Sequence, residues 1–184
     1  MDNPILKLLR ARWASRSISP DPLPEGTIQE LIEAVQMTPS CFNNQPWRFL
    51  FLESPEALAK GREALSEGNQ AWANRAPLLV FGYTRQEDDC VLPDGRVYHQ
   101  FDLGMSVMNL ILSATSHKLV ARPMAGFNPA HVREVFGLDQ EDHPLVAVAI
   151  GELSENEDHL PDRLKGLNDK PRERKNPSAI VQRM

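Results

Sequence analysis

The chain has 184 residues, 41% of them hydrophobic and 24% charged, which is the composition and length of a folded globular domain. Its net charge of −5 excludes the global positive field that would hold nucleic acid or an anionic membrane, so any anion site must be local. No apolar run approaches the roughly 20 residues of a membrane span. We therefore expect one domain over residues 1–184, without a nucleic-acid or membrane partner.

Two features bear on the cellular compartment. The two cysteines, Cys41 and Cys90, have no framework spacing, and residues 2–4 lack the basic and apolar regions of a signal peptide. We therefore expect a cytoplasmic protein.

The N-terminal segment predicts a helix, because Asn3 can cap it and Pro4 suits its first turn. Arg12 falls on the apolar stripe of this helix. An arginine beside an apolar face needs a paired anion, or a packed stem with its head in water. The stripe consists of Ile5, Leu8, Leu9 and Trp13.

The next helix begins at a capping box formed by Thr27 and Glu30 and stops at Pro39. A polar loop follows, and then strands and helices alternate. We expect a strand at 47–52, a helix at 54–65, a covered strand at 78–81 and a turn-rich segment at 84–96.

A long helix begins near Val97 and is apolar on most sides, which predicts a central position. One apolar stripe along it consists of Phe101, Met105, Met108 and Leu112. Small residues such as Gly104 would allow a helix of a second subunit to pack closely.

The last third contains a short segment at 120–127, a helix from Asn128 to Gly137 and a strand at 145–150. The polar residues 152–184 predict an extended arm. Together the elements predict an α+β fold: a central mixed or antiparallel sheet of about four to five strands, flanked by helices, with a central buried helix.

Residues 38–47 form the most informative loop, because they combine a hydroxyl with three amide side chains. These groups either bond to their own backbone, as turn residues do, or contact a ligand. The sequence has no Gly-x-Gly and no Gly-x-Ser-x-Gly, so a dinucleotide fingerprint, a P-loop and a hydrolase elbow are excluded. The histidines have no metal-ligand spacing, so we expect no metal site.

The loop resembles the nitroreductase-family pattern Ala-Pro-Ser-x-x-Asn-x-Gln-Pro-Trp at every position but the first. The resemblance implies an intertwined homodimer with two flavin mononucleotide (FMN) sites at the subunit interface. It also implies that Pro39, Ser40 and Asn43 approach the flavin from the neighbouring subunit.

Residues 12–16 resemble the family's Arg-Arg-Ser-x-Arg segment, with Trp13 and Ala14 as departures. The resemblance implies that Arg12 holds the phosphate and that Arg16 lies near the pyrimidine edge of the flavin. A guanidinium suits both roles, because its planar fork matches phosphate and its charge stabilises the anionic reduced ring.

Three further segments match the family in chain order. The resemblance implies that the Asn69 amide faces the flavin ring, that the turn 123–127 brings backbone amides to N5, and that the basic segment 170–175 returns to the phosphate. The candidate cofactor-binding residues are Arg12, Trp13, Ala14, Arg16, Pro39, Ser40, Asn43, Asn69, Pro123, Met124, Ala125, Gly126, Arg172 and Arg174.

The implied activity is that of an FMN-dependent oxidoreductase. It would accept hydride from NAD(P)H and reduce a nitroaromatic, a quinone or a related small acceptor by a ping-pong mechanism, without a catalytic side chain. The linker between Tyr83 and the central helix is short, which implies a reduced lid. Two other hypotheses are a flavin-binding sensor or carrier without turnover, and an interaction domain without a ligand.

Overall fold

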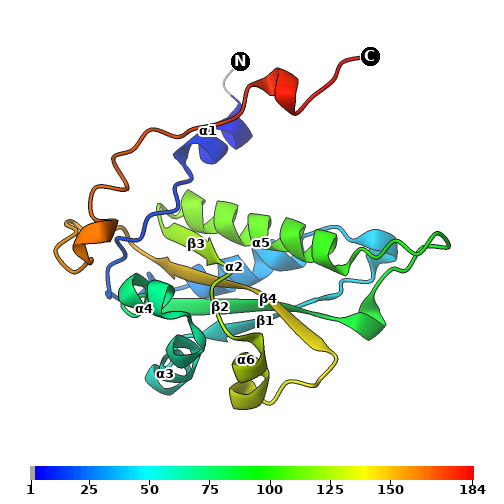
Figure 1. Cartoon of the computed structure of the whole chain (residues 1–184), viewed down its shortest axis with the longest axis horizontal. Coiled ribbons are helices and arrows are strands. Elements are labelled where there is room, and N and C mark those ends of the chain that lie inside the picture. The colour runs from blue at the N-terminus through cyan, green and yellow to red at the C-terminus, as the bar shows by residue number, and fades with distance from the viewer. Residues whose placement is uncertain (1–2) are drawn as a thin grey trace.

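The computed structural model describes residues 3–184 and contains one four-stranded sheet (Figure 1). Its strand order is β1-β2-β4-β3, and every neighbouring pair is antiparallel. The α+β prediction is confirmed, and the sheet is antiparallel rather than mixed. The strands are β1 (Trp47–Leu52), β2 (Leu78–Arg85), β3 (Val120–Met124) and β4 (Asp142–Gly151).

Six α-helices lie in the described part of the chain; five of them cover the two faces of the sheet, and α1 lies beyond α5 (Figure 1). They are α1 (Pro4–Ala11), α2 (Thr27–Gln36), α3 (Pro55–Ala64), α4 (Glu67–Ala73), α5 (His99–Ser116) and α6 (Pro129–Phe136). Short 3₁₀ turns lie at Cys41–Asn43, Gln86–Asp88, Asp162–Leu164 and Pro177–Ala179. No helix among residues 3–184 is long and apolar enough to cross a bilayer.

The alternating side chains of β2 build two cores. Leu79 and Phe81 pack with α3, α4 and α6 on one face, whereas Leu78 and Val80 pack with α2 and α5 on the other. Every residue of β2 except the last is buried. The continuous apolar run of the sequence therefore marks a strand that is covered on both faces.

Helix α5 is buried on one side only. Leu103, Val107 and Leu110 face the sheet, whereas Phe101 is 61% exposed. The other members of its stripe, Met105, Met108 and Leu112, are only partly buried. The expectation of a central buried helix is thus half correct within one chain, because no third layer covers the outer side of α5.

Two local expectations at helix ends need correction. Helix α1 ends at Ala11, so Arg12 lies just past the helix rather than on its stripe, and no residue of α1 is buried. Helix α2 is capped by Gly26 at φ +81°, and Thr27 is its first residue, so no capping box forms. Helix α4 was not expected.

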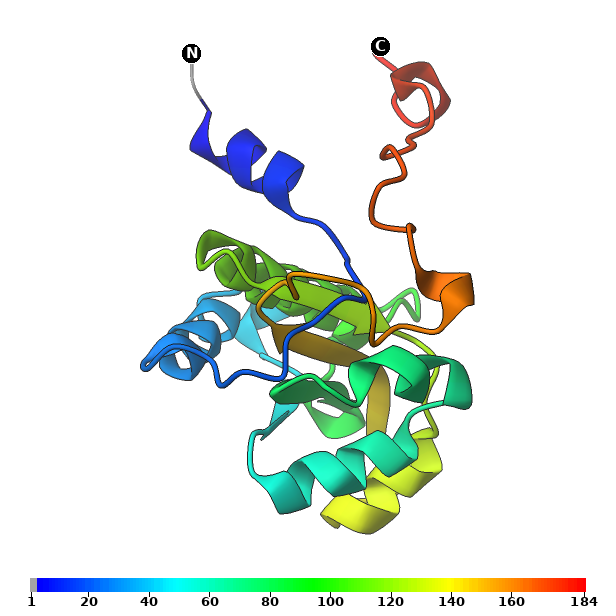
Figure 2. The same ribbon diagram turned by 90° about the vertical axis from the view of Figure 1, so that its left-hand side faces the viewer.

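The two ends of the described chain lie on the same side of the molecule. Figure 2 shows α1 and the C-terminal tail rising beyond the layer that contains α5. Met1 and Asp2 lie outside the described residues, so the expectation of a cytoplasmic protein depends partly on residues without a described structure.

Candidate cofactor site

A cavity of about 260 Å³ lies where the N-terminal segment meets the C-terminal tail. Five of its lining residues are arginines: Arg12, Arg16, Arg122, Arg172 and Arg174. Within residues 3–184, none of the five forms a salt bridge with a carboxylate. Glu173 also lines the cavity, so the five arginines outnumber its carboxylate and the excess positive charge favours an anion.

Arg172 joins the tail to the end of α1. Its guanidinium donates hydrogen bonds to the carbonyls of Leu9 (3.0 Å), Arg10 (3.2 Å) and Arg12. It also stacks 5.3 Å from the centre of the Trp13 ring, and its buried Nε has no partner. A cation on the last carbonyls of a helix is favourable, so Arg172 has a structural role beside any ligand role.

Arg12 and Arg174 keep their side chains free for a ligand. Burial lowers the pKa of Arg12, and the nearby charges of Arg172 and Arg174 lower it further. Arg174 is exposed, and among residues 3–184 it donates only to the Glu173 carbonyl, at 2.6 Å. The two predicted basic segments thus converge on one cavity although some 160 residues separate them in sequence.

Arg16 and Arg122 form a second group of cations. Burial and, to a smaller extent, the charge of Arg16 together lower the pKa of Arg122 to about 10. Arg122 therefore keeps its proton at neutral pH. Sequence reasoning missed Arg122, although the signal was present as an arginine inside the short strand-like segment 120–127.

Asn69 is fixed by hydrogen bonds on both sides of its amide group. Its Nδ2 donates to the Gly126 carbonyl (2.9 Å), and its Oδ1 accepts from Nε1 of the buried Trp72 (3.3 Å). The Ser66 N–H also donates to the Gly126 carbonyl, at 2.9 Å. The predicted turn is thereby held against the start of α4.

The turn 123–126 fits a close backbone approach. A Cβ at Gly126 would lie 2.6 Å from the Ser66 Oγ and 2.8 Å from the Asn69 Nδ2, so any larger residue would have to displace these side chains. Pro123 and Ala125 are exposed, whereas the Met124 side chain is buried in the core. Met124 can therefore offer only its backbone to a ligand.

The loop that carries Pro39, Ser40 and Asn43 does not line this cavity. It lies at the N-terminal end of α5, where the Cys41 N–H donates to Asp102 at 3.1 Å. Pocket residue Trp13 shares a hollow with Thr115 near the other end of the helix. At about 1.5 Å per residue, Asp102 and Thr115 are about 20 Å apart, so one chain does not bring the two predicted sets together.

The same loop has an unusual backbone. Asn43 and two of its neighbours, Phe42 and Gln45, have φ between +49° and +59°, the left-handed region that ordinary residues avoid. The Gln45 N–H donates to the Ser40 Oγ at 2.9 Å, as in an ordinary polar turn. A disulfide also joins Cys41 to Cys90, which ties the loop to the segment before α5.

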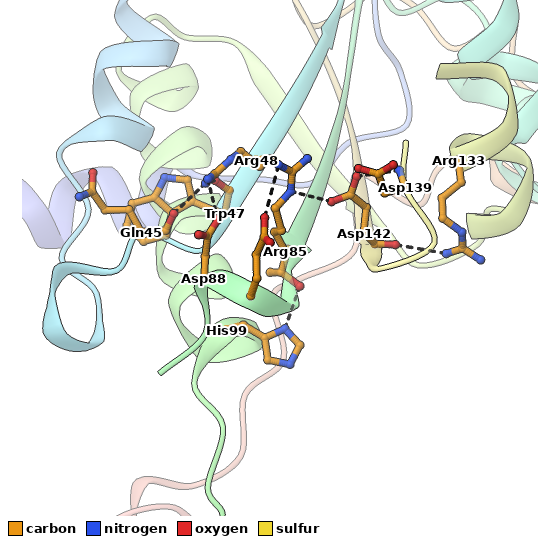
Figure 3. Close-up of polar contacts among 11 residues, drawn as sticks. Gln45, Trp47, Arg48, Arg85, Asp88, His99, Arg133, Asp139 and Asp142 are labelled. Carbon is orange, nitrogen blue, oxygen red and sulfur yellow. Dashed lines mark hydrogen bonds and ion pairs between the residues drawn. The ribbon is translucent and has the colours of Figure 1, made fainter. Parts of the chain in front are cut away.

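Arg48 anchors the far end of this loop (Figure 3). Its guanidinium donates to the carbonyls of Gln45 (2.9 Å) and Trp47 (2.8 Å) and forms an ion pair with Asp88 at 2.6 Å. The loop is therefore fixed to the segment after β2.

Comparison with known proteins identifies the family of this chain. The family model described as "Nitroreductase family" matches residues 9–71 and 59–152. The chain belongs to the nitroreductase family. Both matched ranges include segments that carry the predicted cofactor residues.

The names of individual relatives are consistent with this family assignment. A protein of Stenotrophomonas maltophilia (strain K279a) with the provisional name NADH dehydrogenase/NAD(P)H nitroreductase is 31% identical over 165 residues, covering 79% of this chain and 84% of that protein. A Thermus thermophilus NADH dehydrogenase is 29% identical over 181 residues, covering 80% and 87%. A solved oxidoreductase described as containing FMN is 28% identical, with a TM-score of 0.85 over 99% of this chain and 91% of that one.

Proposed function

We propose that this protein is an FMN-dependent oxidoreductase that takes electrons from NAD(P)H. The observation that carries the proposal is the cavity lined by five arginines. Trp72 links it to the Asn69–Gly126 contact, because Trp72 stacks with Arg122 and donates to Asn69. FMN fits these groups chemically. Its phosphate is a dianion that arginines can bind, and its ring can accept hydrogen bonds from a side-chain amide and from backbone N–H groups that approach closely. Relatives named as NAD(P)H nitroreductase and NADH dehydrogenase, and one solved relative that contains FMN, support it.

Within the proposal, Arg12 and Arg174 hold the phosphate, and Arg172 orients both by joining the tail to α1. Arg16 lies at the pyrimidine edge, and Asn69 faces the ring. When bound, FMN supplies the redox chemistry by accepting hydride from NAD(P)H and passing it to an acceptor in a ping-pong sequence. The chain contributes position and positive charge, so we assign no catalytic acid or base.

We further propose that residues 1–184 act as one domain, with residues 152–184 as an arm, and that two copies form the working unit. Phe101 on the outer stripe of α5 is exposed, and the loop with Ser40 and Asn43 lies at the opposite end of α5 from the hollow that Trp13 shares with Thr115. A second copy packed on this stripe would bring its loop to the arginine cavity of the first.

The natural acceptor is a small molecule, and a nitroaromatic or a quinone is the first class to test. Only residues 86–98 connect β2 to α5, so little chain is present to cover the ring. A thin cover favours flat acceptors that stack on an open ring face.

The test uses the purified full-length protein. We expect a yellow protein, or one that takes up added FMN, and bleaching of the flavin absorbance when NADH or NADPH is added without oxygen. A colourless protein that does not bind FMN would overturn the proposal. Bound flavin that neither nucleotide reduces would favour the sensor or carrier instead.

A further inference from the structure

Arg122 is a half-buried cation without a counterion. It lies on β3 and lines the arginine cavity, yet no carboxylate within residues 3–184 pairs with it. Burying an unpaired charge is unfavourable, so a fold keeps such a group where an anion arrives.

Two contacts hold the Arg122 guanidinium in place. One N–H donates to the Ala14 carbonyl, in the middle of the N-terminal cofactor segment. The group also stacks on Trp72, with 5.4 Å between its central carbon and the ring centre. Because Trp72 is 2% exposed, this platform cannot move away from the cavity.

Arg122 is set apart from Arg12 and Arg174, the arginines proposed to hold the phosphate. The charge that acts on Arg122 is that of Arg16, whereas Arg172 and Arg174 act on Arg12. Trp72 also donates to Asn69, which in turn holds Gly126. Arg122 therefore links the arginine cavity, through Trp72, to the Asn69–Gly126 contact.

We infer that Arg122 is a second cation for the pyrimidine edge of the flavin, held on Trp72, and that it favours the reduced cofactor over the oxidised one. The inference depends on the proposed function. The physical reason is that reduction by NAD(P)H places negative charge on the ring, and a fixed cation beside that edge stabilises the charge in a site with little water.

The test replaces Arg122 with glutamine and measures FMN affinity and the two-electron reduction potential. We expect R122Q to weaken reduced FMN about tenfold more than oxidised FMN, which corresponds to a potential about 30 mV more negative. The matched control is R75Q, which removes the same charge from a residue outside the cavity and should leave the potential unchanged.

Two further variants separate charge from structure. R122K keeps the cation and should keep the reduction potential while binding both forms of FMN more weakly. If R122Q does not fold, the potential of R122K still tests whether the charge at this position sets the reduction potential. W72F keeps a ring under the guanidinium but loses the bond to Asn69, so it should lower affinity without shifting the potential.

Equal weakening of both FMN forms in R122Q, or a potential shift in R122K as large as that expected for R122Q, would overturn the inference. Either result would assign Arg122 to packing of the Ala14 segment alone. These outcomes differ from a failure of the proposed function, in which the wild-type protein itself would not bind FMN.

Discussion

Asp102 is a carboxylate buried in the first turn of α5, with 1% of its surface exposed. Its Oδ2 accepts from the Cys41 N–H, while its Oδ1 has no hydrogen-bond partner among residues 3–184. Burial raises the pKa of Asp102 above its usual 3.8, with the bond from Cys41 opposing the shift and the charge of Asp89 adding to it. The protonated form therefore stabilises the fold.

This gives a pH prediction. The stability from protonated Asp102 is complete below its unfolded pKa and is lost as the pH rises through its raised folded pKa. We expect D102N to have a larger free energy of unfolding than the wild type. The difference should grow as the pH rises from the unfolded to the folded pKa of Asp102, to a total of about 1.4 kcal/mol for each unit that separates the two pKa values. Denaturant unfolding from pH 4 to pH 8 measures it, and a constant difference would refute the assignment.

Arg172 and Arg174 differ in what they do without a ligand. Loss of the Arg172 bonds to α1 should release the tail at a cost of about 1–2 kcal/mol, so limited proteolysis of the tail in apo R172A should be roughly 5- to 30-fold faster. R174A should leave proteolysis unchanged and weaken FMN binding only. Equal proteolysis in the two variants would contradict this division of roles.

At the scale of elements, the turn after β3 depends on its packing against the start of α4. A methyl group at Gly126 would displace Asn69 and Ser66, so G126A should lower the free energy of unfolding by about 1–3 kcal/mol and weaken FMN binding. The control is G68A, where a Cβ meets nothing within 4 Å and the free energy should change by less than about 1 kcal/mol. Chemical denaturation of both variants checks this, and a stable G126A would count against the close packing.

The elements show what the sequence could and could not predict. Three of the four strands and five of the six helices follow from capping residues, prolines and apolar periodicity, as at Asn3 and Asn128, whereas 120–127 was expected only as a short segment and contains β3. Helix α4 was missed because it is short and polar on its outer side. The start of α2 was misassigned because Gly26 takes the cap and Thr27 turns inward.

Residues of the candidate site could be predicted from the sequence only where they belong to a recognisable motif. Arg12, Arg16 and Arg174 came from matched segments, and the fold brings them to one cavity. Arg122 and Trp72 lie outside the motifs that the sequence analysis identified, and the contact that joins them spans 50 residues of chain. Such pairs appear only once the sheet and α4 are placed together.

At the scale of the whole molecule, the outer stripe of α5 should be a subunit contact. Phe101 is 61% exposed on that stripe, so F101E should shift the protein from dimer to monomer in light scattering and lose FMN with it. The control is A59E, which adds the same charge to an exposed residue of α3, on the face of the sheet opposite to α5. A dimeric, FMN-loaded F101E would place the contact elsewhere.

The central claim is that each FMN site combines the arginine cavity of one subunit with the Ser40–Asn43 loop of the other. It can be tested with two inactive variants, R12A/R16A with a damaged cavity and S40A/N43A with a damaged loop, co-expressed with different tags and purified as the heterodimer. One of the two sites in that heterodimer is then intact. We predict one tightly bound FMN per heterodimer, against none in either variant alone, whereas a heterodimer that binds no FMN would contradict the shared site.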